Sequence, residues 1–143
     1  MRRTTSLNPE PWPWPDHPRI LVENPDDAAG LQLATVLRDA GYGVAVCPGP
    51  AAHERCPLAG PEGCTIAQGA DAVVFGLGLE RAETREVLQA LRARAPHLPI
   101  VVETTRAEEE LWPELLRGCE VVRPWGPPEQ LVSAVHRALE RTA

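Results

Sequence analysis

The chain has 143 residues, of which 43% are hydrophobic and 24% charged, and its formal net charge is -6. This composition argues against a disordered chain and fits one domain that buries a core without disulfides. The negative charge argues against direct binding of nucleic acid, which needs clustered cations. No apolar run reaches the length of a membrane span or a signal peptide, so we expect no membrane association and a cytoplasmic address.

All 14 basic residues are arginine, because the chain contains no lysine. This excludes Schiff-base chemistry on a lysine, a lysine general base and the lysine of a phosphate-binding loop. No recognisable set of nucleophile, base and orienting acid is present, and no glycine-rich phosphate loop follows a strand. We therefore do not expect an enzyme.

Residues 1–18 hold five prolines with Trp12 and Trp14 between them. Proline at this density prevents both a helix and a central strand, so we expect an extended tail. Two tryptophans are costly to leave in water, and we expect them to pack either on their own domain or on a partner. The folded domain is expected to cover residues 19–143.

From residue 19 onward, short apolar runs alternate with helical patterns. The expected strands cover residues 20–22, 43–47, 71–75, 99–103 and 120–123. The expected helices cover residues 25–40, with Asn24 as the cap, and residues 80–95, 107–117 and 128–141. Residues 47–69 gather cysteine, proline and glycine without helical periodicity, and a loop of that length is usually functional.

This alternation predicts an α/β fold of one domain, with a five-stranded parallel sheet and helices on both faces. The expected strand order is 2-1-3-4-5. In such sheets a site lies beyond the carboxyl ends of the strands, which here means the residues that follow Val22, Phe75, Val102 and Val122.

The order of the elements, Thr104 at a strand end and the turn Arg123-Pro124-Trp125 resemble the receiver domain of bacterial response regulators. The resemblance covers nearly the whole chain and implies a flavodoxin-like fold. The cysteine-rich insert has no place in the family pattern.

The resemblance also implies where a phosphorylation pocket would lie. Glu23 and Asn24 stand where receivers carry the acidic pair that holds Mg²⁺, so one carboxylate remains. The aspartate that accepts the phosphoryl group should follow the third strand, but Gly76 stands there and has no side chain to phosphorylate. Thr104 supplies the expected hydroxyl, and Arg123 replaces the expected lysine. This pattern predicts a degenerate receiver that has lost phosphotransfer.

Arg123 could instead pair with Glu23 or Glu103 and fill the emptied pocket, or it could be a solvated surface arginine.

Receivers signal through the face formed by the fourth helix, fifth strand and fifth helix, where the matching positions here include Trp112 and Trp125. The resemblance therefore implies a phosphorylation-independent regulatory module that binds a protein partner or a second copy through this face. For Trp125 itself, the favoured interpretation is an aromatic at the edge of the core.

Four potential metal ligands lie close together in sequence at Cys47, His53, Cys56 and Cys64. Three thiols and an imidazole can bind Zn²⁺ tetrahedrally, although the usual close pair of cysteines is missing. A reversible disulfide between Cys56 and Cys64, or buried unreactive thiols, would also fit. We expect no cofactor unless these residues bind zinc, and a thiol-redox or metal sensor is the alternative function.

Overall fold

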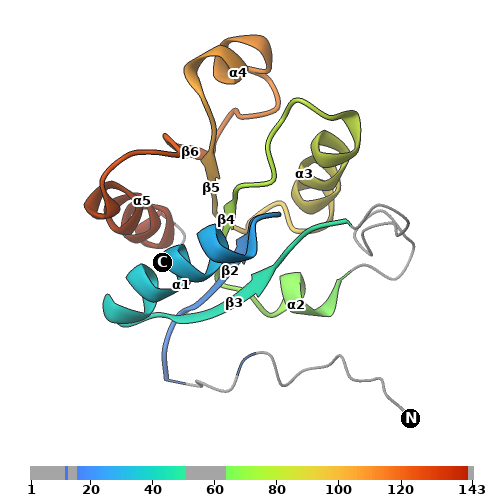
Figure 1. Ribbon diagram of the computed structural model, residues 1–143. Helices are drawn as coiled ribbons and strands as arrows, with labels where there is room; N and C mark the ends of the chain where they lie inside the picture. Colours follow the sequence, from blue (N-terminus) through green and yellow to red (C-terminus); the bar gives the residue numbers. More distant parts are fainter. Residues whose placement is uncertain (1–11, 13–15, 51–63, 142–143) are drawn as a thin grey trace.

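A parallel sheet of five strands runs through the centre of the molecule (Figure 1). The computed structural model describes residue 12 and residues 16–50 and 64–141. The strands are β2 (Arg19–Glu23), β3 (Gly43–Cys47), β4 (Ala72–Phe75), β5 (Ile100–Glu103) and β6 (Glu120–Val122). Their order is β3-β2-β4-β5-β6, and every neighbouring pair is parallel. Numbered along the chain, this is the predicted order 2-1-3-4-5.

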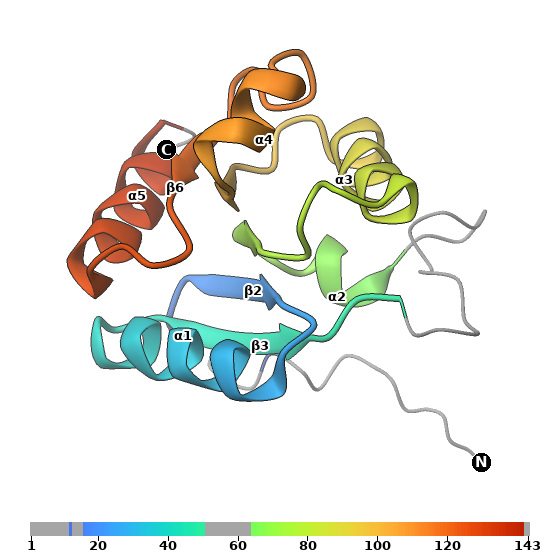
Figure 2. The same ribbon diagram turned by 45° about the horizontal axis from the view of Figure 1, so that its top comes forward.

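Helices cover both faces of the sheet, as predicted. They are α1 (Asp27–Asp39), α2 (Thr65–Gln68), α3 (Ala82–Arg94), α4 (Arg106–Leu111) and α5 (Pro128–Glu140). Figures 1 and 2 show α1 and α5 on one face and α2 and α3 on the other. Two buried clusters result, one between the sheet and α1 with α5, the other between the sheet and α3. Strands β2, β3, β4 and β5 contribute to both clusters in alternation, which is why their central residues are apolar.

The cap of α1 differs from the prediction. Asp26, not Asn24, is the N-cap, and its carboxylate accepts hydrogen bonds from the backbone N–H groups of Ala28 and Ala29. The Asn24 side chain accepts from the backbone N–H of Asp26 instead, at 2.9 Å. The helix ends at Asp39, and Gly41 two residues later is the expected stop, because its φ of 102° is readily adopted only by glycine.

Two further boundaries differ from the prediction. Residues 65–68 form the short helix α2 inside the segment expected to be a loop. Helix α4 ends at Leu111 rather than continuing to residue 117. Pro113 explains this end, because a proline disfavours the helical conformation of the residue before it, and Trp112 has φ -128° and ψ 51°.

One described residue of the tail, Trp12, packs on the folded domain. Trp12 is partly buried and packs against the cluster beneath α3, which is the first of the two alternatives considered for the tail. Trp14 lies outside the described residues. Among the helices of the described residues, none is long and apolar enough to cross a membrane. The cytoplasmic address remains a prediction.

Candidate functional site

The residues predicted for the phosphorylation pocket lie at or directly after the carboxyl ends of four strands. Glu23 is the last residue of β2 and Asn24 follows it, while Gly76 and Thr104 follow β4 and β5. Backbone hydrogen bonds hold these ends together: the N–H of Gly76 donates to the carbonyl oxygen of Glu23 at 2.7 Å. The N–H of Thr104 donates to the carbonyl oxygen of Val122 at 2.9 Å, which brings the end of β6 and Arg123 alongside.

Gly76 lies in a crowded environment. A Cβ atom at this position would lie 3.0 Å from the carbonyl oxygen of Glu23 and 3.1 Å from Oε1 of Glu103. It would also lie 3.2 Å from Nδ2 of Asn24. These distances are shorter than ordinary van der Waals contacts, so a Cβ atom at position 76 would require its neighbours to shift by a few tenths of an ångström. Glu103 was considered at the sequence level only as a partner for Arg123.

Glu23 is buried, with 2% of its surface exposed, and its Oε1 has no hydrogen-bond partner among the described residues. Burial raises the pKa of its carboxyl group from 4.5 to about 7. Burial also raises the pKa of the half-buried Glu103. Both carboxyl groups therefore favour the neutral, proton-bearing form more than ordinary surface glutamates do.

Thr104 is 1% exposed, and its hydroxyl donates to Oε1 of Glu108 at 2.7 Å. The same carboxylate belongs to a capping box with Thr105, the N-cap of α4, and accepts from the backbone N–H of Leu79 at 3.3 Å. Glu108 thus fixes the Thr104 hydroxyl to α4 and to the β4–α3 loop. Our sequence reasoning missed Glu108, although the spacing Thr105-x-x-Glu108 is the signature of a capping box.

Arg123 does not pair with Glu23 or Glu103, which corrects the sequence-based hypothesis. Its Nη2 lies 2.7 Å from Oε1 of Glu109 on α4, and its Nη1 donates to the carbonyl oxygen of Thr104 at 3.1 Å. Arg123 therefore ties the β6–α5 loop to the start of α4 rather than neutralising the buried carboxyl group.

Replacing Arg123 with alanine is expected to lower the free energy of unfolding by about 1 kcal/mol, because the pair with Glu109 is partly exposed and solvent screens it. Urea denaturation of Arg123→Ala, Glu109→Ala and the double variant measures the coupling between the two side chains. If the losses in free energy of unfolding of the two single variants add up to that of the double variant, the ion pair contributes no interaction energy to stability. The exposed pair of Arg117 and Glu114 provides a matched control.

The cysteine-rich insert is only partly described. Cys47 and Cys64 are half-buried and pack against the cluster beneath α3, whereas His53 and Cys56 lie outside the described residues. No disulfide joins two of the described cysteines. Within residues 16–50 and 64–141, no three side chains of the metal-ligating kinds lie close enough to hold an ion. The zinc and disulfide hypotheses stay predictions that metal analysis and thiol counting can test.

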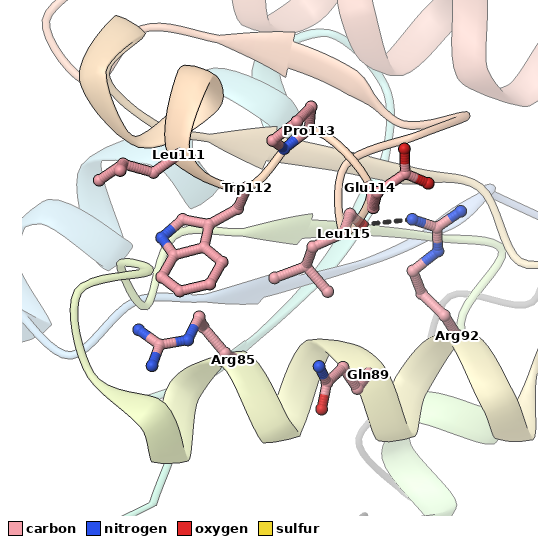
Figure 3. Close-up of a pocket in the computed structure, with 8 residues that line it drawn as sticks. All are labelled: Arg85, Gln89, Arg92, Leu111, Trp112, Pro113, Glu114 and Leu115. Atoms are coloured by element: carbon pink, nitrogen blue, oxygen red, sulfur yellow. Dashed lines mark hydrogen bonds between the residues drawn. The ribbon is translucent and has the colours of Figure 1, made fainter.

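The two tryptophans assigned to the interaction face lie in different places. Trp125 is 76% exposed in the β6–α5 loop and lines a cavity of about 400 Å³ together with residues of α1 and α5. This cavity also reaches Asn24, Glu103 and Arg123, and we call it the strand-end cavity. Trp112 is half-buried and faces α3 instead (Figure 3). The structure thus does not bring Trp112 and Trp125 together.

Comparison with known proteins gives matches in structure alone, since no family model and no curated protein matches the chain. A CheY-like receiver domain protein from Methanospirillum hungatei superimposes with a TM-score of 0.67 at 18% identity, covering 89% of this chain and 97% of its own. A receiver protein from Sinorhizobium medicae gives 0.68 at 18% identity, covering 90% and 98%.

A third similar structure is a Burkholderia pseudomallei protein described as pilus assembly-related. It gives a TM-score of 0.67 at 22% identity and covers 96% of this chain and 97% of its own. At these identities the similarity concerns architecture. The expected fold is confirmed: the chain has the flavodoxin-like fold of response regulator receiver domains.

Proposed function

We propose that this chain is a regulatory protein-interaction module that uses the receiver fold without phosphorylation. The observation that carries the proposal is Gly76 at the position of the acceptor. The residue offers no carboxylate, and Glu23, Asn24 and Glu103 crowd the place where a Cβ atom would stand. A receiver that has lost its acceptor keeps a folded scaffold and its surfaces for binding.

The remaining pocket residues support the same proposal. Mg²⁺ prefers near-octahedral oxygen coordination, commonly from one or two carboxylates together with phosphate oxygens. Glu23 is poorly suited to this role, because burial favours its neutral form. The Thr104 hydroxyl and the Arg123 guanidinium already bind Glu108 and Glu109, so both side chains serve internal contacts.

For the binding surface we propose the face of α4, β6 and α5, with a protein partner or a second copy as the occupant. Trp125 supports this proposal, since an indole that is 76% exposed is costly to leave in water. Pro124 and Pro127 flank it in the β6–α5 loop, and they restrict the conformations of that loop before binding.

Incubation of the protein with acetyl phosphate and Mg²⁺ is expected to leave its intact mass unchanged in mass spectrometry. The reason is the missing acceptor carboxylate at Gly76. Sedimentation velocity, run with and without the phosphodonor, should give the same oligomeric state. A receiver domain that has its acceptor aspartate serves as the positive control. A species heavier by one phosphoryl group would overturn the proposal.

A further inference from the structure

A cavity of about 560 Å³ lies between α3 and the turn that follows α4 (Figure 3). We call it the α3–α4 pocket. One wall is formed by Arg85, Gln89 and Arg92, which share one face of α3 because they are four and three residues apart. The opposite wall and rim are formed by residues of α4 and its turn: Leu111, Trp112, Pro113, Glu114 and Leu115.

The early end of α4 makes this pocket. Because Pro113 follows Trp112, the helix stops and the chain turns back. The Trp112 indole and the Leu115 side chain point toward α3 (Figure 3). Leu111 remains 68% exposed at the rim. The pocket therefore has an apolar wall that faces a cationic one.

The two arginines are held in place before any ligand binds. The guanidinium carbon of Arg85 lies 4.1 Å from the centre of the Trp112 ring, and its Nη1 donates to the carbonyl oxygen of Leu79 at 2.7 Å. Arg92 donates to the carbonyl oxygens of Leu115 and Arg117. A guanidinium carries five N–H donors, so both groups keep donors beyond these bonds.

The pocket is positive on a protein that is negative overall. Of the described residues that line it, Glu114 is the one acid, and its carboxylate is paired with Arg117 at 2.6 Å. Arg85 and Arg92 thus leave a local positive charge, whereas the whole chain carries a net charge of -6. Such a pocket attracts carboxylates that the rest of the surface repels.

We propose that the α3–α4 pocket binds an acidic segment of a partner protein that carries an apolar side chain between two carboxylates. The apolar side chain would lie against Trp112 and Leu115, and the carboxylates would bind the two guanidinium groups. Arg85 and Arg92 are seven residues apart on a helix, which corresponds to about 10 Å along its axis. An extended peptide points alternate side chains to opposite sides, so carboxylates at positions i and i+2 both face α3 while the apolar side chain between them faces Trp112 and Leu115. Their Cα atoms lie about 7 Å apart, and the length of the two glutamate side chains covers the remaining distance to the guanidinium groups.

The pocket borders the face proposed above only at Leu111 of α4, and Trp125 does not line it. The inference therefore goes beyond the proposed function and can fail independently of it. The probe is a fluorescein-labelled peptide of the sequence Gly-Ser-Glu-Phe-Glu-Ser-Gly, and its binding to the whole chain is followed by fluorescence anisotropy. We expect saturable binding with a submillimolar Kd, weakened by added salt.

Gln89→Glu is the most informative variant. Gln89 is exposed in the middle of α3, and glutamate has a similar helix propensity, so the fold should be preserved. The added negative charge is expected to raise the Kd about fivefold. Gln32→Glu on α1 adds the same charge outside the pocket and should leave the Kd unchanged. Arg85→Gln, with retained folding checked by circular dichroism, should raise the Kd about tenfold.

Two control peptides separate the parts of the site. Replacing phenylalanine with alanine tests the apolar wall, and replacing both glutamates with glutamine tests the arginines; each change should weaken binding at least fivefold. Trp125→Ala should bind the probe as the unchanged protein does. Absence of saturable binding, equal effects of Gln89→Glu and Gln32→Glu, or an alanine peptide that binds as tightly would each overturn the proposal.

Discussion

Replacing Glu23 with glutamine is expected to stabilise the fold at pH 8 by about 2 kcal/mol. Glu23 is 2% exposed, and its Oε1 has no hydrogen-bond partner among the described residues. At pH 8 its carboxyl group is ionised in the folded state, although burial has raised its pKa to about 7. Glutamine keeps the shape and removes the buried charge. It retains a buried amide that also needs partners, which makes the gain smaller than the full cost of the charge.

The sign of the pH dependence follows from the raised pKa. Below pH 4.5, Glu23 is protonated in both the folded and the unfolded chain, and its contribution to stability is fully present. Between pH 4.5 and about 7 the unfolded chain loses the proton while the folded chain keeps it, so the free energy of unfolding falls as the pH rises. The total loss from this group is about 3 kcal/mol. Glu103, whose pKa burial also raises, acts in the same direction.

Urea denaturation at half-unit steps from pH 4.5 to pH 8 measures this effect. The unchanged protein should lose stability over the range, and Glu23→Gln should lose markedly less. Glu80→Gln removes the same charge from an exposed position and serves as the control. Parallel pH profiles for the unchanged protein and Glu23→Gln would contradict the assignment of the raised pKa to this carboxyl group.

The architecture could be predicted because its signals are local. Central strands of a parallel sheet are buried on both faces, so the runs at residues 72–75 and 100–102 are apolar throughout, and both strands were found to within one or two residues. Helix α4 was predicted too long, because the apolar spacing continues through Trp112 and Leu116 although Pro113 ends the helix. The α3–α4 pocket depends on that end and could not be foreseen from the expected longer helix.

The site was predicted in position but not in its contacts. Strand order places Glu23, Gly76 and Thr104 at one edge, and the sequence sufficed for this. The partner of Arg123 depends on where α4 packs relative to β6, which no spacing in the sequence encodes. The crowding around Gly76 is likewise a property of packing, because the side chain of Glu103 comes from a different strand.

Replacing Gly76 with aspartate is expected to lower the free energy of unfolding by about 3 kcal/mol, since it inserts both a Cβ atom and a carboxylate into occupied space. The Cβ would lie 3.0 Å from the backbone oxygen of Glu23, which cannot move aside without disturbing β2. Gly76→Ala separates the two effects and should cost about 1 kcal/mol, because steric strain is partly offset by the lower entropy of the unfolded chain.

Glu103→Ala should recover part of the loss caused by Gly76→Asp, because it removes the carboxylate that lies 3.1 Å from the new Cβ. Urea denaturation of the two single variants and the double variant measures this coupling, and strictly additive losses would show that Glu103 does not crowd position 76.

Gly76→Asp is also expected to stay unphosphorylated by acetyl phosphate and Mg²⁺ in mass spectrometry. The acceptor would return, but Asn24 still replaces the second carboxylate and Arg123 remains bound to Glu109. A phosphorylated Gly76→Asp variant would mean that the acceptor alone separates this chain from a working receiver.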